Sequence, residues 1–302
     1  MSESSAARMQ ILLATDDSAS ARIAEEWVTR LRFAQRPTID VVCVAGRGTA
    51  GPSWGMQTYR EPVRLAVEGL RQNELYAAER IANEVGERLQ RAGFTVHTWA
   101  RQGDCREEIL TMAEVDGPDL IVVGPRGRSG LAAAILGSVT HGLIAHATRP
   151  VLIARPLSAA EGRLPEHALL AVDGARSAEA AVAWLERGGC LAGGRLTVLG
   201  LLGERAGLET DEGEFVEEVK RLVRSDAGDT LGELARPLGG GDVWVDFVMR
   251  GGHPLQATLD TADELGADLV AVARPHRRPA RDPLAEKIAR HASQAVLLVP
   301  QT

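Results

Sequence analysis

Short, nearly continuous apolar runs recur along the chain, and each is bounded by glycine, proline or polar turn residues. Runs of this kind predict buried β-strands. The predicted strands lie at 9–15, 39–45, 94–100, 119–123 and 150–154, and then at 167–172, 195–202, 243–249, 268–272 and 295–299. Between the first five strands, amphipathic stretches predict helices at 19–34, 61–92, 105–115 and 138–147. In the longest of these, an approximate 3.6-residue period links Leu70, Tyr76, Ala77, Ile81 and Val85.

The alternation of strand and helix indicates the fold class. Parallel strands need crossover connections, which are usually helices, and these helices then cover both faces of the sheet. We therefore predict an α/β protein with two tandem, doubly wound domains. Each would hold a five-stranded parallel sheet covered by helices on both faces.

The two halves of the chain are copies of one another. Identical residues stand at matching places: Leu12 and Leu169, Asp16 and Asp173, Trp27 and Trp184, Gly103 and Gly252, His146 and His291. Repeats of this length indicate a duplicated domain. We place the first domain at 1–156 and the second at 166–302, with the proline- and glycine-containing stretch 155–165 as the linker.

Each copy ends in an apolar strand, 150–154 in the first and 295–299 in the second. An apolar strand at a sheet edge favours pairing with another strand. We predict that the two domains pack as a pseudo-dimer, with these two strands side by side. A homodimer of the whole chain stays open.

Composition narrows the classes of function. The chain has 302 residues, which fits two domains, and a formal net charge of −7 at pH 7. The negative charge argues against nucleic acid or an anionic membrane as partner. No apolar run is long enough to cross a membrane and the first residues lack a signal-peptide core, so we expect a cytoplasmic protein. The three cysteines, Cys43, Cys105 and Cys190, lack zinc-site spacing and are interpreted as buried free thiols.

A glycine motif follows the fourth predicted strand. The strand runs into Gly124 and Gly127, and after nine further residues Gly137 and Ser138 open a helix. Glycines let the backbone approach a phosphate, and the first turn of a helix offers unpaired N–H groups. Ser138 would be the N-cap or would turn its hydroxyl to a phosphate or a cation. The alternative is that these are turn and cap glycines without a ligand.

This motif, with Asp16 after the first strand, resembles the ATP-binding branch of the universal stress protein family, and the likeness extends over both copies. The resemblance implies a Rossmann-like fold of the adenine-nucleotide-binding kind. It also implies that ATP binds in the first domain, with or without Mg²⁺; the sequence identifies no metal ligands. By the same resemblance, Asp16 would contact adenine or ribose and Val44 would face the base. Val123, Gly124 and Gly127 would form the loop around ribose and phosphates, and Gly137, Ser138 and Val139 would meet the phosphates.

Three neighbouring positions leave alternatives open. Asp16 could instead cap the helix that follows it. Asp17 is expected to be solvated. Arg126 and Arg128 would either meet phosphate oxygens or face solvent.

The second copy departs from the motif. Ala273, His276, Asp282 and Pro283 stand where the first copy has Gly124, Gly127, Gly137 and Ser138. A carboxylate at the phosphate position would repel the ligand, although Asp282 and Pro283 still form a good helix start. The basic stretch 274–281 is interpreted as a solvated loop. We predict a degenerate second site and one ATP per chain.

Little in the sequence points to catalysis. A Walker-type lysine motif is absent and the first half has no lysine. His141 and His146 are spaced so that they fall on different faces of a helix. We expect a nucleotide-dependent regulatory or stress-response protein with an unidentified protein partner. The alternatives are a slow ATPase or nucleotide hydrolase, and a nucleotide-free scaffold.

Overall fold

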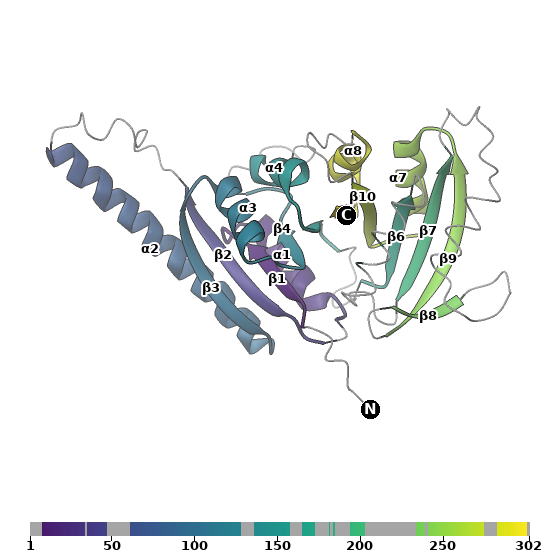
Figure 1. Cartoon of the computed structure of the whole chain (residues 1–302), viewed down its shortest axis with the longest axis horizontal. Coiled ribbons are helices and arrows are strands. Elements are labelled where there is room, and N and C mark those ends of the chain that lie inside the picture. The colour runs from purple at the N-terminus through teal and green to yellow at the C-terminus, as the bar shows by residue number, and fades with distance from the viewer. Residues whose placement is uncertain are drawn as a thin grey trace.

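The structure is a computed structural model of the whole chain (Figure 1). It describes residues 8–33, 35–46, 61–127, 136–157, 165–172, 181, 184, 194–202, 234–238, 241–274 and 283–300. For residues 61–64, 202, 234–238, 241–242 and 283 only the backbone is described. The predicted Asp173, Cys190, His276 and Asp282, and Arg128 of the glycine loop, lie outside these ranges.

The first half alternates strands and helices as predicted. Its strands are β1 (Gln10–Ala14), β2 (Thr38–Gly46), β3 (Thr95–Gly103), β4 (Leu120–Val123) and β5 (Val151–Ile153). Its helices are α1 (Ala19–Arg30), α2 (Glu61–Arg91), α3 (Cys105–Val115) and α4 (Ser138–His146). All the described pairings among these strands are parallel, in the order β3-β2-β1-β4-β5.

The second half repeats this order. Its strands are β6 (His167–Val172), β7 (Arg195–Leu202), β8 (Leu234–Leu238), β9 (Gly241–Gly251), β10 (Leu269–Arg274) and β11 (Ala295–Pro300). Helices α7 (Pro254–Glu264) and α8 (Pro283–His291) lie before β10 and β11.

Strand β8 was not predicted, and with it the second half contributes six strands. It pairs antiparallel with β9, and its residue Pro237 is opposite Asp242. Proline cannot donate to a strand ladder, so it weakens a strand signal, but an edge strand tolerates it. The prediction of five strands was therefore wrong for this half by one antiparallel edge strand.

The two halves share one 11-stranded sheet, in the order β3-β2-β1-β4-β5-β11-β10-β6-β7-β9-β8 (Figure 1). They are joined where β5 pairs antiparallel with β11, with Leu152 opposite Leu297. The equivalent strands of the two copies thus run past each other in opposite directions. The predicted pseudo-dimer, with 150–154 beside 295–299, is confirmed.

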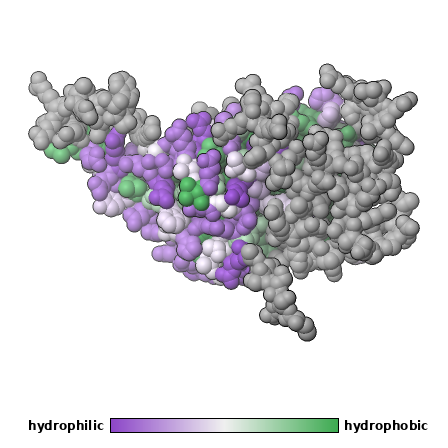
Figure 2. Space-filling view, in the orientation of Figure 1, coloured by the Kyte–Doolittle hydropathy of each residue, from purple (hydrophilic) through white to green (hydrophobic). Residues whose placement is uncertain are grey.

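The hydrophobic core lies on both faces of this sheet. Along β1, Ile11 and Leu13 face α1 and α2, while Leu12 faces α3 and α4, which is the two-residue period of a strand. Both core layers continue into the second half. The part of the surface that is coloured in Figure 2 is mainly hydrophilic, with scattered small apolar areas.

Helix α2 extends beyond the sheet (Figure 1). Its buried stripe starts at Ala78 and includes Ile81 and Val85, but Leu70 and Tyr76 are 58% and 60% exposed. Periodicity therefore identified the helix correctly, but it assigned Leu70 and Tyr76 to the buried side, whereas they lie on the side of the helix that faces solvent.

Candidate functional site

A pocket of about 320 Å³ opens at the carboxyl edge of the sheet in the first half. Strands β1, β2 and β4 end there, and α3 and α4 begin beside it. This edge is where open α/β sheets bind ligands. All eight predicted site residues line this one pocket: Asp16, Val44, Val123, Gly124, Gly127, Gly137, Ser138 and Val139.

One side of the pocket is apolar. Ala14 and Val42 contribute from β1 and β2, and Ile109 contributes from α3. Cys105, at the start of α3, is half-buried here, and its thiol lies 3.9 Å from the carbonyl oxygen of Val44. Burial raises the pKa of the Cys105 thiol, so it stays protonated at neutral pH. These side chains could cover a flat, apolar ring.

Sequence reasoning missed Cys105, which it treated only as a buried thiol. The available signal was its position directly after β3, at the same carboxyl edge as the glycine motif. Cys43 is buried on the opposite face and forms no disulfide, as the sequence predicted.

Asp16 enters the pocket through a tight turn between β1 and α1. Its Oδ1 accepts a hydrogen bond of 3.0 Å from the Ser18 N–H. The N-cap of α1 is Ser18, whose Oγ accepts from the Ala21 N–H. The alternative that Asp16 caps this helix is therefore wrong, and its carboxylate lies toward Gly127 instead.

The expectation that Asp17 is solvated is also wrong. Asp17 has a left-handed backbone, with φ 57°, which aspartate tolerates better than most residues. Its carboxylate accepts hydrogen bonds from Arg22, at 3.2 Å, and from Arg88 of α2, at 3.3 Å. The hydrogen bond from Arg22 is the main reason that the pKa of Asp17 is lowered. These contacts hold the turn that directs Asp16 to the pocket.

The glycines of the motif are required by close backbone packing. A Cβ at Gly124 would collide with the carbonyl of Ser20 in the first turn of α1. A Cβ at Gly137 would lie 3.2 Å from the Cα of Arg126, and one at Gly127 would lie 2.9 Å from Oδ2 of Asp16. Side chains at 127 and 137 would therefore crowd the cradle between β4 and α4.

The start of α4 faces this cradle without a side-chain cap. Its N-cap is Gly137, not Ser138, and Gly137 donates its own N–H to the carbonyl of Pro125 at 3.0 Å. By contrast, Ser18 caps α1 and Asp104 caps α3 with side-chain oxygens. The first turn of α4 can therefore offer backbone N–H groups to an anion.

Thr140 connects the helix to the loop. Its hydroxyl donates a hydrogen bond of 3.0 Å to the carbonyl of Gly124, and its side chain is buried. Sequence reasoning did not identify Thr140, because one threonine in a helix carries no signal before the fold brings β4 beside it. Arg126 also lines the pocket and supplies its cationic side chain.

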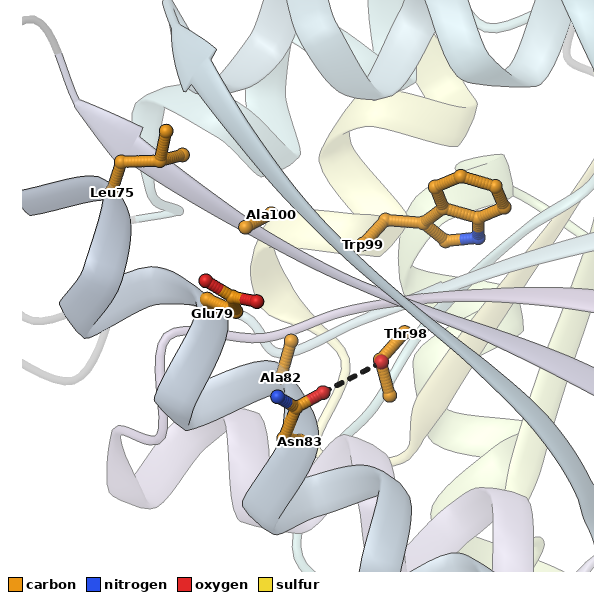
Figure 3. Close-up of a pocket in the computed structure, with 7 residues that line it drawn as sticks. All are labelled: Leu75, Glu79, Ala82, Asn83, Thr98, Trp99 and Ala100. Carbon is orange, nitrogen blue, oxygen red and sulfur yellow. Dashed lines mark hydrogen bonds between the residues drawn. The ribbon is translucent and has the colours of Figure 1, made fainter. Parts of the chain in front are cut away.

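A second cavity, of about 280 Å³, lies between α2 and β3 (Figure 3). The Thr98 hydroxyl and the Asn83 side chain form a hydrogen bond of 2.7 Å across it, and the Trp99 ring points away from the helix. This cavity lacks the cradle of glycines and the helix start, so it is the weaker candidate.

Neither a metal centre nor a membrane span emerges from the part of the chain that the structure describes. Within it, histidine, cysteine and acidic side chains do not gather in groups of three or more that could hold a metal ion. Nor does any helix in the same ranges have the length and apolar character to cross a bilayer.

Comparison with known proteins agrees with this geometry. The profile of the universal stress protein family matches residues 8–155 and again residues 165–300. The chain belongs to the universal stress protein family. Both halves of this tandem universal stress protein therefore have the same family fold.

Individual relatives match shorter stretches. Universal stress protein YxiE of Bacillus subtilis is 41% identical over 76 residues, which is 25% of this chain and 51% of the relative. A universal stress protein of Mycolicibacterium smegmatis is 28% identical over 180 residues, covering 59% of this chain and 58% of the relative. The chain thus spans about half of the length of the curated relatives it matches.

The tandem arrangement has a solved counterpart. The crystal structure of a universal stress protein from Archaeoglobus fulgidus superposes with a TM-score of 0.71 at 20% identity. The superposition covers 97% of this chain and 98% of the Archaeoglobus fulgidus chain. At this identity the comparison shows that the fold is shared.

Proposed function

We propose that this universal stress protein binds ATP in its first half, with one ATP per chain, and acts as a nucleotide-dependent regulatory protein in the stress response. The observation that carries the proposal is the convergence of an apolar slot and an uncapped helix start in one pocket. A nucleotide needs both, because its base is apolar and its phosphates are anionic.

The residues fit this ligand. Val44, Ile109 and Cys105 would cover the base, and Asp16 would accept hydrogen bonds from the nucleoside. The backbone of Gly127, the first turn of α4 and Arg126 would hold the phosphates. A volume of about 320 Å³ is at the lower end of small-molecule sites.

The same lining disfavours fast chemistry. Among the described residues of the pocket, Asp16 is the single carboxylate and Arg126 the single cationic side chain. Asp16 already accepts the Ser18 N–H, so it is a positioned acceptor more than a free base. We expect ATP turnover below roughly one per minute, against a median enzyme rate of about ten per second.

Two binding measurements and a turnover assay test the proposal. Mass spectrometry of ligand released from freshly purified protein should detect an adenine nucleotide, and titration calorimetry of stripped protein should give one site per chain. Two equivalent sites would contradict the degenerate second site, and the absence of any nucleotide binding would leave the scaffold alternative. Turnover near the median enzyme rate that is lost in Asp16→Ala would favour the hydrolase.

A further inference from the structure

Arg274 is a buried arginine of the second half that reaches into the first. It ends β10 and is only 3% exposed, although the stretch 274–281 was expected to be a solvated loop. Its Nη1 donates a hydrogen bond of 3.1 Å to the carbonyl of Ile144 in α4. For Arg274, the expectation of a solvated position is therefore wrong.

The carbonyl that Arg274 bonds is one that the helix itself leaves open. Ile144 belongs to the last turn of α4, where the final four carbonyls have no partner within the helix. The N–H of Ala147, the residue after the helix, donates to the carbonyl of Leu143 and not to that of Ile144. A guanidinium at this end also complements the negative pole of the helix. Arg274 thus acts as a charged C-terminal cap supplied by the other half of the chain.

A mirrored contact shows that this cap belongs to the packing of the two halves. Nη2 of Arg155, from the first half, donates at 2.8 Å to the carbonyl of Ala289 in α8. Ala289 is the counterpart of Ile144, since each stands two residues before the matching histidines His146 and His291. The same carbonyl in each copy is therefore bonded by an arginine of the other copy.

In the repeat, Arg274 occupies a position that belongs to the glycine loop in the first half. It aligns with Pro125, inside the glycine loop of the first half. The second half thus has a long donor where the first half has a residue with no side-chain donor. The two helices whose carbonyls are bonded in this way, α4 and α8, also contact each other directly. Nε2 of His141 in α4 lies 3.4 Å from Oε1 of Glu286 in α8.

We infer that Arg274 is a positioning residue for the nucleotide site of the other half. The inference rests on the proposed function. Helix α4 is nine residues long, so Gly137 and Ile144 lie roughly 10 Å apart along one rigid element. Holding its last turn therefore sets where its first turn meets the cradle. The degenerate half serves the ATP site by fixing the phosphate-facing helix.

The test compares Arg274→Met and Arg274→Lys with wild type and with Trp184→Phe as the control, all in the full chain. Nε1 of Trp184 donates at 3.0 Å to the carbonyl of Asp119, just before β4. That contact also joins the halves, but it does not touch α4. Each protein is titrated with ATP and with adenosine. Amide hydrogen exchange is measured without ligand for His141 to Leu143, because the His141 N–H bonds the Gly137 carbonyl and these amides close the first turn of α4.

The expected result separates positioning from stability. Arg274→Met should weaken ATP binding about fivefold or more, leave adenosine affinity within about twofold, and speed exchange in the first turn of α4. Arg274→Lys keeps a cationic donor and should recover part of each loss. Trp184→Phe should lower the melting temperature with little effect on the ratio of the two affinities.

Other outcomes overturn the inference. Equal losses for ATP and adenosine in Arg274→Met, or unchanged exchange in the first turn of α4, would make Arg274 a purely structural residue. If Arg274→Met does not fold, Arg274→Gln, which lacks the charge, takes its place, and equal losses for ATP and adenosine in that variant decide against the inference. Failure of wild type to bind ATP would refute the proposed function itself, whereas the exchange data still report whether Arg274 holds α4.

Discussion

The Thr140 hydroxyl donates a hydrogen bond to the carbonyl of Gly124 and so joins the start of α4 to the end of β4. The Thr140 side chain is buried, so loss of its hydroxyl would leave the Gly124 carbonyl unpaired away from water, which is costly. Together with the bond from the Gly137 N–H to the Pro125 carbonyl, the Thr140 bond sets the spacing between the loop glycines and the helix start.

The first prediction follows from this bond. Thr140→Val keeps the shape but leaves the Gly124 carbonyl without its donor, at a cost of about 1–3 kcal/mol. We expect a lower melting temperature and weaker ATP binding, measured by thermal unfolding and calorimetry. Thr140→Ser keeps the hydroxyl and serves as the matched control. Equal ATP affinities in the two variants would show that the bond does not shape the site.

The second prediction concerns Gly137. Gly137→Asp brings in the residue of the second copy, and a carboxylate beside phosphates at 4 Å costs about 4 kcal/mol at a near-surface dielectric. ATP binding should become undetectable in calorimetry, while the fold survives because aspartate is a good N-cap.

Gly137→Ala separates charge from crowding. Its Cβ would lie 3.2 Å from the Cα of Arg126, so the loop must shift by a few tenths of an ångström. We expect a moderate loss of ATP affinity. Unchanged affinity in the Asp variant would mean that the phosphates bind elsewhere.

The third prediction is a dependence of stability on pH through His167. This histidine is buried, and its ring nitrogens lie 2.8 Å from Oγ1 of Thr197 and 3.2 Å from the carbonyl of Leu265. Burial lowers the pKa of His167 below its usual value of about 6.5. In the unfolded chain the ring takes up a proton near pH 6.5, whereas in the folded protein it resists protonation. The contribution of His167 to stability is therefore complete above pH 6.5 and is lost as the pH falls through the folded-state pKa.

The matched variant is His167→Gln, since Gln10 stands at the corresponding place in the first half. Urea unfolding at pH 7.5 and at pH 5.0 should show a smaller drop in the free energy of unfolding for the variant than for wild type. Equal drops would assign the acid sensitivity to other groups.

The fourth prediction concerns the shared sheet. Residues 1–157 expressed alone would leave the edge of β5 without Val296, Leu297 and Leu298, which pair with it in the full chain. An apolar open edge favours association, so the fragment should dimerise or aggregate in analytical ultracentrifugation. A fragment that stays monomeric at high micromolar concentration, with full ATP affinity, would show that the first half does not need this pairing.

The sequence by itself determined the repeat, the alternation of strands and helices, and eight of the residues that line the candidate site. These features are local or periodic: apolar runs mark the buried strands of a parallel sheet, and the glycine motif directly follows one of these runs in the sequence. The pairing of β5 with β11 was also predictable, because two apolar edge strands in one chain find each other at high effective concentration.

Only the tertiary structure decided which distant groups meet. Arg274 lies next to Ile144, and Thr140 next to Gly124, because sheet order and strand register bring them together. The exposure of Leu70 and Tyr76 depends on which side of α2 faces β3, and strand β8 depends on an edge of β9 that could accept it. A residue's own pattern contains no information about such neighbours, since hydrogen bonds between segments far apart in the sequence arise only from packing.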